Sequence, residues 1–107
     1  MMDWQVPKDI DQECVVLCKA LNCLDGIRTI ESCCGHGEHP FRVWFKAENL
    51  EALPEALYYF DCCHSGISGW SVHATTDCGM SPVTFMVEGP EGDYDGANTI
   101  AHAMNFP

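Results

Sequence analysis

The sequence is poor in basic residues: it has 5 Lys and Arg against 16 Asp and Glu, which gives a net charge of −11 at pH 7. Binding to nucleic acid or to an anionic membrane needs Lys and Arg near the phosphate groups. The composition therefore argues against direct contact with nucleic acid or membrane. A strongly acidic chain is instead attracted to basic protein surfaces, including those that normally hold DNA or RNA.

The sequence also lacks a long apolar run and a secretory signal. No stretch approaches the ~20 apolar residues that cross a bilayer. The segment from Met1 to Gln5 has neither the basic nor the apolar region of a signal peptide. We therefore expect an intracellular, cytoplasmic protein. In that reducing compartment, the 8 cysteines are expected to be metal ligands and core thiols rather than disulfides.

Known catalytic motifs are missing as well. The chain has no H-E-x-x-H, no H-x-E paired with C-x-x-C, no glycine-rich phosphate loop before a helix and no G-x-S-x-G. A small zinc enzyme that acts on a nucleotide or peptide bond is the alternative function. Its general base would be Glu31, Glu38 or Asp61. Its nucleophile, if a thiolate, would be Cys33 or Cys34.

The sequence does contain clear helix and strand patterns over the length of one domain. Its 107 residues are enough to bury one core. Apolar spacing predicts helices at 9–24, 49–60 and 97–104, and strands at 27–32, 41–46, 69–75 and 83–87. The order α-β-β-α-β-β-α predicts a single α+β domain. In it, about three helices pack on a mostly antiparallel sheet of about four strands.

Two details of the helices can be tested. In the first helix, Cys14, Cys18 and Cys23 are expected to be small buried hydrophobes, because free cysteine is among the most buried residue types. In the second, Pro54 must fall near the first turn or mark a restart, because a deeper proline would break the helix. The apolar stripe expected to face the core there is Leu50, Leu53, Leu57 and Phe60.

The densest group of metal-ligand residues runs from Ser32 to His39. Cys33 and His36 have the spacing of a zinc knuckle, a tight turn that directs two ligands at one ion. Gly35 and Gly37 can adopt positive φ, which allows the sharp bend that such a turn needs. Two ligands are half of a site, so the others must come from elsewhere in the chain.

Two further predicted turns carry such residues: Cys62, Cys63 and His64 follow the second helix, and Cys78 precedes the last strand. A structural zinc takes four thiolate or imidazole ligands. We predict a zinc ion that staples the three turns together, with His39 as the reserve ligand and with Cys34, Cys62 or His64 as substitutes for a neighbour. The predicted ligands are Cys33, His36, Cys63 and Cys78.

Acidic residues also cluster before the last helix, where Glu91-x-Asp93-x-Asp95-Gly96 imitates the start of an EF-hand loop. Glu91 stands where Asp usually begins such a loop, and His102 stands where a bidentate Glu should close it. We therefore expect a solvated acidic loop rather than a calcium site.

Two acidic patches are predicted to dock a basic partner, and Trp4 or Trp44 could supply an aromatic anchor beside them. The N-terminal patch consists of Asp9, Asp11 and Glu13. The loop patch consists of Glu88, Glu91, Asp93 and Asp95.

The combination SCCGHG…PFRVWF…ALYYFDCCHSG…GW…TDCGMSPVTFMVEGP covers most of the chain. It resembles a family of small Cys/His-rich proteins encoded by bacteriophages and mobile elements. Size, acidity and expected metal are also similar to those of phage anti-defence proteins, among them the anti-CRISPR inhibitors of Cas9. The resemblance implies a zinc-stabilised inhibitor that occupies a basic surface of a host defence protein, such as a Cas9-type nuclease. A fainter similarity, carried by Thr29 to His36, is to the wybutosine-synthesis methyltransferase family.

Overall fold

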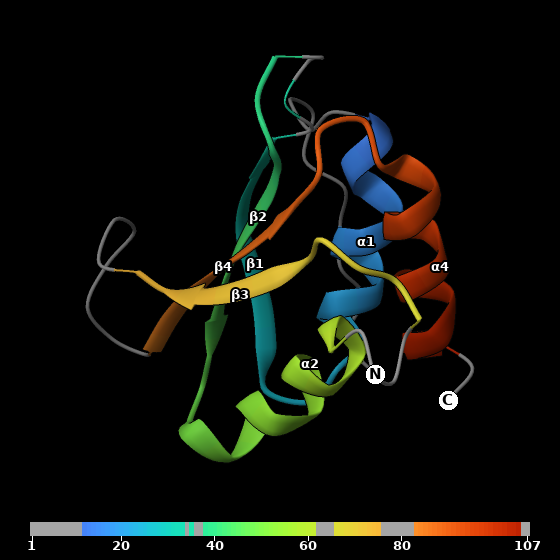
Figure 1. The fold of residues 1–107 in the computed structure, drawn as a ribbon. Coiled ribbons are helices and arrows are strands. Elements are labelled where there is room, and N and C mark those ends of the chain that lie inside the picture. Colours follow the sequence, from blue (N-terminus) through green and yellow to red (C-terminus); the bar gives the residue numbers. More distant parts are fainter. Residues whose placement is uncertain (1–11, 34, 36–37, 62–65, 76–82, 106–107) are drawn as a thin grey trace.

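The computed structural model describes residues 12–33, 35, 38–61, 66–75 and 83–105. Over these residues the element order is the predicted one, α-β-β-α-β-β-α, with a short 3-10 helix before the second α-helix (Figure 1). The elements are α1 (Gln12–Asn22), β1 (Ile27–Cys33), β2 (Phe41–Ala47), η1 (Leu50–Ala52), α2 (Leu53–Phe60), β3 (Ser71–Ala74), β4 (Val83–Gly89) and α4 (Tyr94–Asn105).

The four strands form one antiparallel sheet in the order β1-β2-β4-β3, which confirms the predicted α+β class. The register defines two ends of the sheet. The residues paired across it at the Cys33 end are Cys33, Arg42, Glu88 and Ser71. Those paired across it at the Ile27 end are Ile27, Ala47 and Val83. The turn that joins β1 to β2 therefore lies at the Cys33 end of the sheet, whereas β2 ends and β4 begins at the Ile27 end.

The core lies on one face of the sheet. Phe41, Val43 and Phe45 of β2 are fully buried, as their alternation predicts. They share one hydrophobic cluster with residues of α1, α2 and α4. Figure 1 shows these helices on the same side of the sheet. Among the described helices, none has the length and hydropathy needed to cross a membrane.

Helix α1 packs on β1 through buried side chains that include Cys14 and Cys18, as predicted. The prediction for Cys23 is wrong, because this residue is exposed. The helix ends at Asn22, where the side-chain amide donates to the Thr29 hydroxyl (2.7 Å) and accepts from the Thr29 N–H (3.0 Å). These bonds turn the chain into β1, so Cys23 falls in the turn rather than on the buried stripe.

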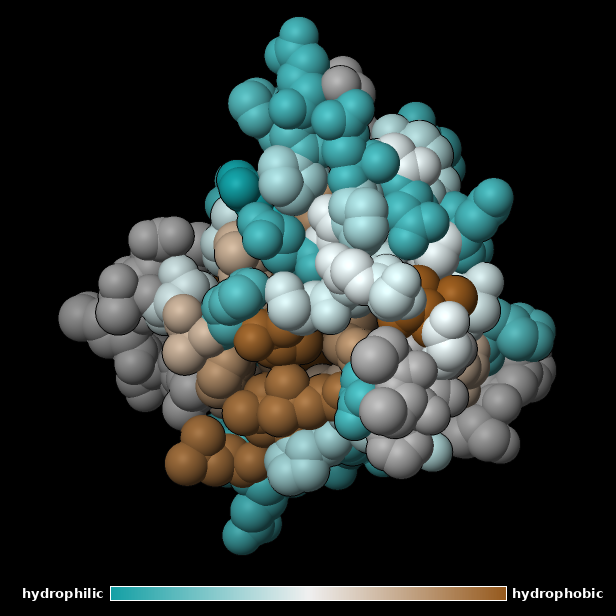
Figure 2. Space-filling model, in the orientation of Figure 1, coloured by the Kyte–Doolittle hydropathy of each residue, from teal (hydrophilic) through white to brown (hydrophobic). Residues whose placement is uncertain are grey.

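Only half of the apolar stripe predicted for the second helix faces the core: Phe60 is buried and Leu53 packs against the core cluster, whereas Leu50 and Leu57 are exposed. The chain first forms η1, which Asn49 caps by accepting the N–H of Ala52 (3.1 Å). It then restarts as α2 with Pro54 in the first turn, as the proline rule allows. The 3-10 turn changes the helical phase, so Leu50 and Leu57 are 65% and 40% exposed. Figure 2 shows the resulting hydrophobic surface over η1 and α2. The buried side chains of α2 are Ala56, Tyr59 and Phe60.

Helix α4 begins at Tyr94, three residues before the predicted start. Asp93 caps it, because its Oδ1 accepts the N–H of Gly96 (3.1 Å). The other carboxylate oxygen accepts from the indole N–H of buried Trp70 (2.9 Å). A Cβ on Gly89 would collide with the Trp70 ring, so glycine is needed beneath it. The loop was predicted to be solvated, but its central acid is a structural residue.

Candidate functional site

The hairpin turn between β1 and β2 begins with the predicted metal ligand Cys33, which is half-buried. The N–H of Gly35 donates to its Sγ (3.4 Å). Gly35 has φ +90°, and its carbonyl accepts the N–H groups of Glu38 (2.9 Å) and His39 (3.0 Å). A Cβ on Gly35 would collide with the His39 carbonyl, so only glycine fits this turn. Hydrogen bonds to a ligand atom fix its orientation toward a metal.

The other three predicted ligands, His36, Cys63 and Cys78, lie outside the described residues, as do Cys34, Cys62 and His64. The reserve ligand His39 is described and exposed. In the part of the chain that the structure describes, no three His, Cys, Asp or Glu side chains lie close enough to hold an ion together. The predicted zinc site therefore remains a prediction.

The strand register sets a condition on the predicted zinc site. Val83 and Ala74, the strand residues on either side of the turn that carries Cys78, lie at or next to the Ile27 end of the sheet. Cys33 lies at the other end, about six residues or roughly 20 Å away along the strands. A single ion that binds both Cys33 and Cys78 requires that distance to be bridged.

The buried thiol of Cys18 does not suit catalysis. Burial raises the pKa of Cys18 to about 11, and a hydrogen bond with Ser32 lowers it by a smaller amount. At neutral pH this side chain is therefore a neutral thiol, as expected of a core residue. The predicted general bases Glu31, Glu38 and Asp61 are all exposed.

The two predicted acidic patches are only partly available. In the loop patch, Asp93 is the α4 cap, and Glu88 pairs with Arg42 across the sheet (3.0 Å). In the N-terminal patch, Glu13 is exposed, whereas Asp9 and Asp11 lie outside the described residues. Trp44 is half-buried on the side of the sheet opposite the helices, and Trp4 is not described.

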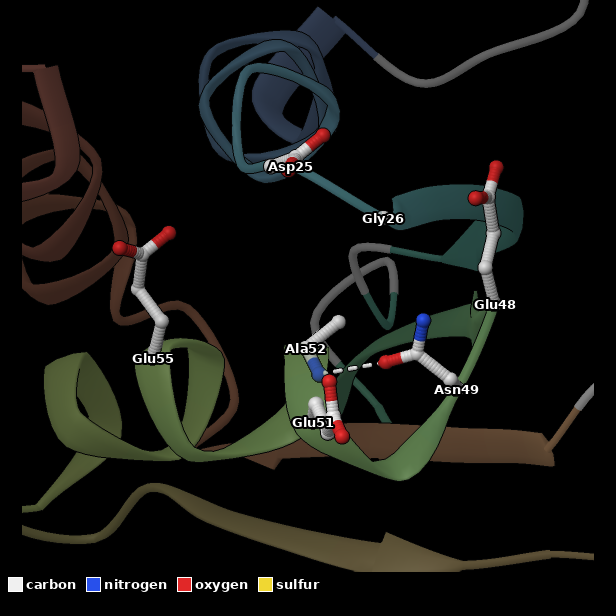
Figure 3. A pocket seen from close by; sticks show the side chains of 7 residues that line it. All are labelled: Asp25, Gly26, Glu48, Asn49, Glu51, Ala52 and Glu55. Atoms are coloured by element: carbon white, nitrogen blue, oxygen red, sulfur yellow. Dashed lines mark hydrogen bonds between the residues drawn. The ribbon is translucent and has the colours of Figure 1, made fainter.

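A third acidic surface, which the sequence did not reveal, surrounds a hollow of about 340 Å³. Four carboxylates from separate segments line it, and no Lys or Arg is among the lining residues (Figure 3). We call it the acidic hollow. Its lining residues are Asp25, Gly26, Glu48, Asn49, Glu51, Ala52 and Glu55.

Backbone contacts hold the acidic hollow in shape. Gly26 has φ +79°, and its carbonyl accepts the N–H of Glu48 (2.8 Å), which ties the turn after α1 to the end of β2. A Cβ on Gly26 would lie 2.9 Å from the Cβ of Ala52, so η1 packs directly on the turn. In Figure 3, Glu48 and Glu55 lie on opposite sides of the hollow, and Asp25 lies across it from Ala52.

The charges of the acidic hollow are not neutralised within the described residues. None of its four carboxylates forms an ion pair there. Arg28 and Lys46, on the paired strands β1 and β2, line an adjacent pocket together with Glu48, so cations lie near the hollow on its Glu48 side. The negative charge of Glu55 also adds to the effect of burial in raising the pKa of Tyr59. The negative potential of the hollow is therefore strongest around Asp25, Glu51 and Glu55.

Only part of this surface has a signal in the sequence. Glu51 and Glu55 stand four residues apart, which puts them on one side of a helix. Asp25 and Glu48 join them because β1 and β2 pair, so that the turn before β1 meets the segment after β2. The chain matches no protein-family model, no curated protein and no solved structure.

Proposed function

We propose that this chain is a metal-stabilised acidic binding module that inhibits a host nucleic-acid-handling defence protein by occupying a basic surface on it. The first partner to test is a Cas9-type nuclease, which makes the host cytoplasm the place of action. The observation that carries the proposal is the acidic hollow, which four carboxylates line with no Lys or Arg among the lining residues.

The physical basis is charge complementarity. Carboxylates that gather without cations repel one another, and Lys and Arg side chains of a partner relieve that repulsion. The same field accelerates association with a basic surface. A nuclease channel that holds a guide–target duplex is lined by such cations. An acidic protein on that channel would therefore compete with nucleic acid for it.

In this proposal zinc is a structural ion at the hairpin turn. Its proposed ligands are Cys33, His36, Cys63 and Cys78, with His39 in reserve, and they offer the mixed sulfur and nitrogen donors that zinc prefers. The N–H of Gly35 orients the Cys33 sulfur. A bound zinc would cross-link the turn and would take no part in a catalysed reaction. The chain's own residues would do the binding.

The experiment is a competition between this protein and target DNA for a purified Cas9-type nuclease loaded with its guide. Glu51→Lys with Glu55→Lys should weaken binding by about tenfold or more, and raised salt should weaken the wild type. The control is Glu31→Lys with Glu38→Lys, which makes the same change in net charge at two exposed sites outside the hollow and outside both predicted patches.

Three outcomes decide the matter. A loss confined to the Glu51 and Glu55 variant supports docking through the hollow. Equal losses of affinity in both variants would show that only the net charge of the protein matters for binding. The hollow would then be removed from the proposal. Failure of the wild type to bind the nuclease or to compete with DNA would overturn the choice of partner.

A further inference from the structure

Exposed apolar side chains are concentrated on η1 and α2, the segments that also carry Glu51 and Glu55 of the acidic hollow. The described part of the chain has five large hydrophobic residues that are exposed, and three of them belong to η1 and α2. Leu50 is 65% exposed, Leu57 40% and Tyr58 51%. Pro54, between them in the chain, is exposed as well. We call Leu50, Pro54, Leu57 and Tyr58 the apolar edge.

The core does not require these residues. Helix α2 covers it with Ala56, Tyr59 and Phe60, whereas Leu57 lies at the edge of that buried face. Burying a leucine stabilises a protein by about 1.5–3 kcal/mol. Leu50, at 65% exposed, forgoes most of that gain, and Leu57, at 40% exposed, forgoes a smaller part of it. A helix that served only to cover the core would carry polar residues at these positions. The apolar edge therefore has the character of a surface that is covered by another molecule.

The charge beside the apolar edge limits what that molecule can be. Glu51 and Glu55, on the same two helical segments, line the hollow together with Glu48. A second copy of this chain would bring a net charge of −11 against another −11, so self-association is opposed. Nucleic acid and anionic lipid are repelled for the same reason. A basic protein segment is the partner whose charge fits.

We propose that the apolar edge binds a Lys- and Arg-rich amphipathic segment of a protein partner, whose large apolar side chains cover Leu50 and Leu57 while its cations lie over the acidic hollow. Such a segment presents its apolar side chains on one face, as in other helix-in-groove complexes. The apolar contacts set the lifetime of the complex, and the carboxylates set the rate at which it forms. This inference rests on the proposed function, because it names the contact by which the basic partner is held.

The probes are two synthetic peptides of equal positive charge. The first is an amphipathic helix with Leu and Phe at three- and four-residue spacing on one face and Lys and Arg on the other, and the second has Ser in place of every Leu and Phe. Association and dissociation rates are measured with the full chain. We expect the first peptide to bind at least about tenfold more tightly than the second, chiefly through slower dissociation.

The variants separate the two contributions. Leu50→Ser with Leu57→Ser should remove the preference for the apolar peptide. Val16→Ser with Ile30→Ser is the matched control, because these residues are 47% and 41% exposed on other elements and should leave the preference intact. Glu51→Lys with Glu55→Lys should weaken both peptides by slowing association. If the double variant does not fold, Leu50→Ser alone, in η1, should reduce the preference for the apolar peptide.

Equal binding of the two peptides by the wild type would overturn this inference. The proposed function would still stand if the Glu51 and Glu55 variant weakened both peptides. No binding of either peptide would overturn both. Self-association of the wild type that Leu50→Ser with Leu57→Ser abolishes would also overturn this inference, because a second copy would then be the occupant.

Discussion

Gly26 and Ala52 lie in direct contact, although the first follows α1 and the second ends η1. A Cβ added to Gly26 would stand 2.9 Å from the Cβ of Ala52, which is closer than a Cβ atom normally comes to a non-bonded carbon atom in folded proteins. The contact joins the turn between α1 and β1 to the helical segment that carries Glu51 and Glu55. It therefore holds two sides of the acidic hollow at a fixed separation.

Replacement of Gly26 by alanine should destabilise the protein for two reasons. A positive φ costs an L-residue roughly 1–2 kcal/mol, and the contact with Ala52 adds a clash, so the total should reach about 2–4 kcal/mol. Gly92→Ala is the control, because Gly92 has φ +73° and open space at its Cβ position. Urea unfolding measures both variants. Equal losses would show that Ala52 moves away without cost.

Replacement of Asp93 by alanine should be costly because it removes the cap of α4 and leaves the indole N–H of Trp70 without its acceptor. Loss of a cap costs about 0.5–2 kcal/mol and an unsatisfied buried donor about 1–3 kcal/mol, so unfolding should become easier by roughly 2–4 kcal/mol. Asp93→Asn keeps an oxygen in place and should cost less than about half of that. Asp95→Ala, at an exposed neighbour, should have little effect. A similar loss for all three variants, measured by urea unfolding, would contradict the cap assignment.

Alkaline pH should destabilise the protein through Cys18. Its pKa is about 11 in the folded chain against an ordinary 9.0, so the unfolded chain releases this proton first. The stabilisation is complete below pH 9 and is lost as pH rises through about 11, by about 2–3 kcal/mol in total. Cys18→Ala should flatten the dependence of unfolding free energy on pH in reducing buffer. Cys23→Ala, which changes an exposed thiol, should leave the dependence as in the wild type.

Protein purified without added metal should contain about one zinc ion per chain. Cys33→Ser should lower the zinc content and the melting temperature together, because a structural ion contributes its binding energy to folding. Gly35→Ala should act in the same direction, since its Cβ would collide with the His39 carbonyl. Cys23→Ser is the control. Elemental analysis that finds less than roughly a fifth of an equivalent in the wild type would refute the metal.

Sequence patterns were reliable where one element could be judged alone. Strand β2 alternates Phe41, Val43 and Phe45 with polar residues, and only one face of such a strand can be buried. Patterns failed where two local rules competed. The leucine spacing of the second helix assumed one continuous α-helix, whereas Asn49 and Pro54 favour a 3-10 turn followed by a restart.

The sequence by itself determined the order of elements, the antiparallel α+β class and the excess of negative charge, because periodicity and composition are local properties of a chain. Only the tertiary structure decided where that charge gathers. Pairing of β1 with β2 brings Asp25 beside Glu48, and the phase of α2 turns Leu57 outward. Contacts between residues far apart in the chain follow from strand register and helix packing, which no single segment specifies.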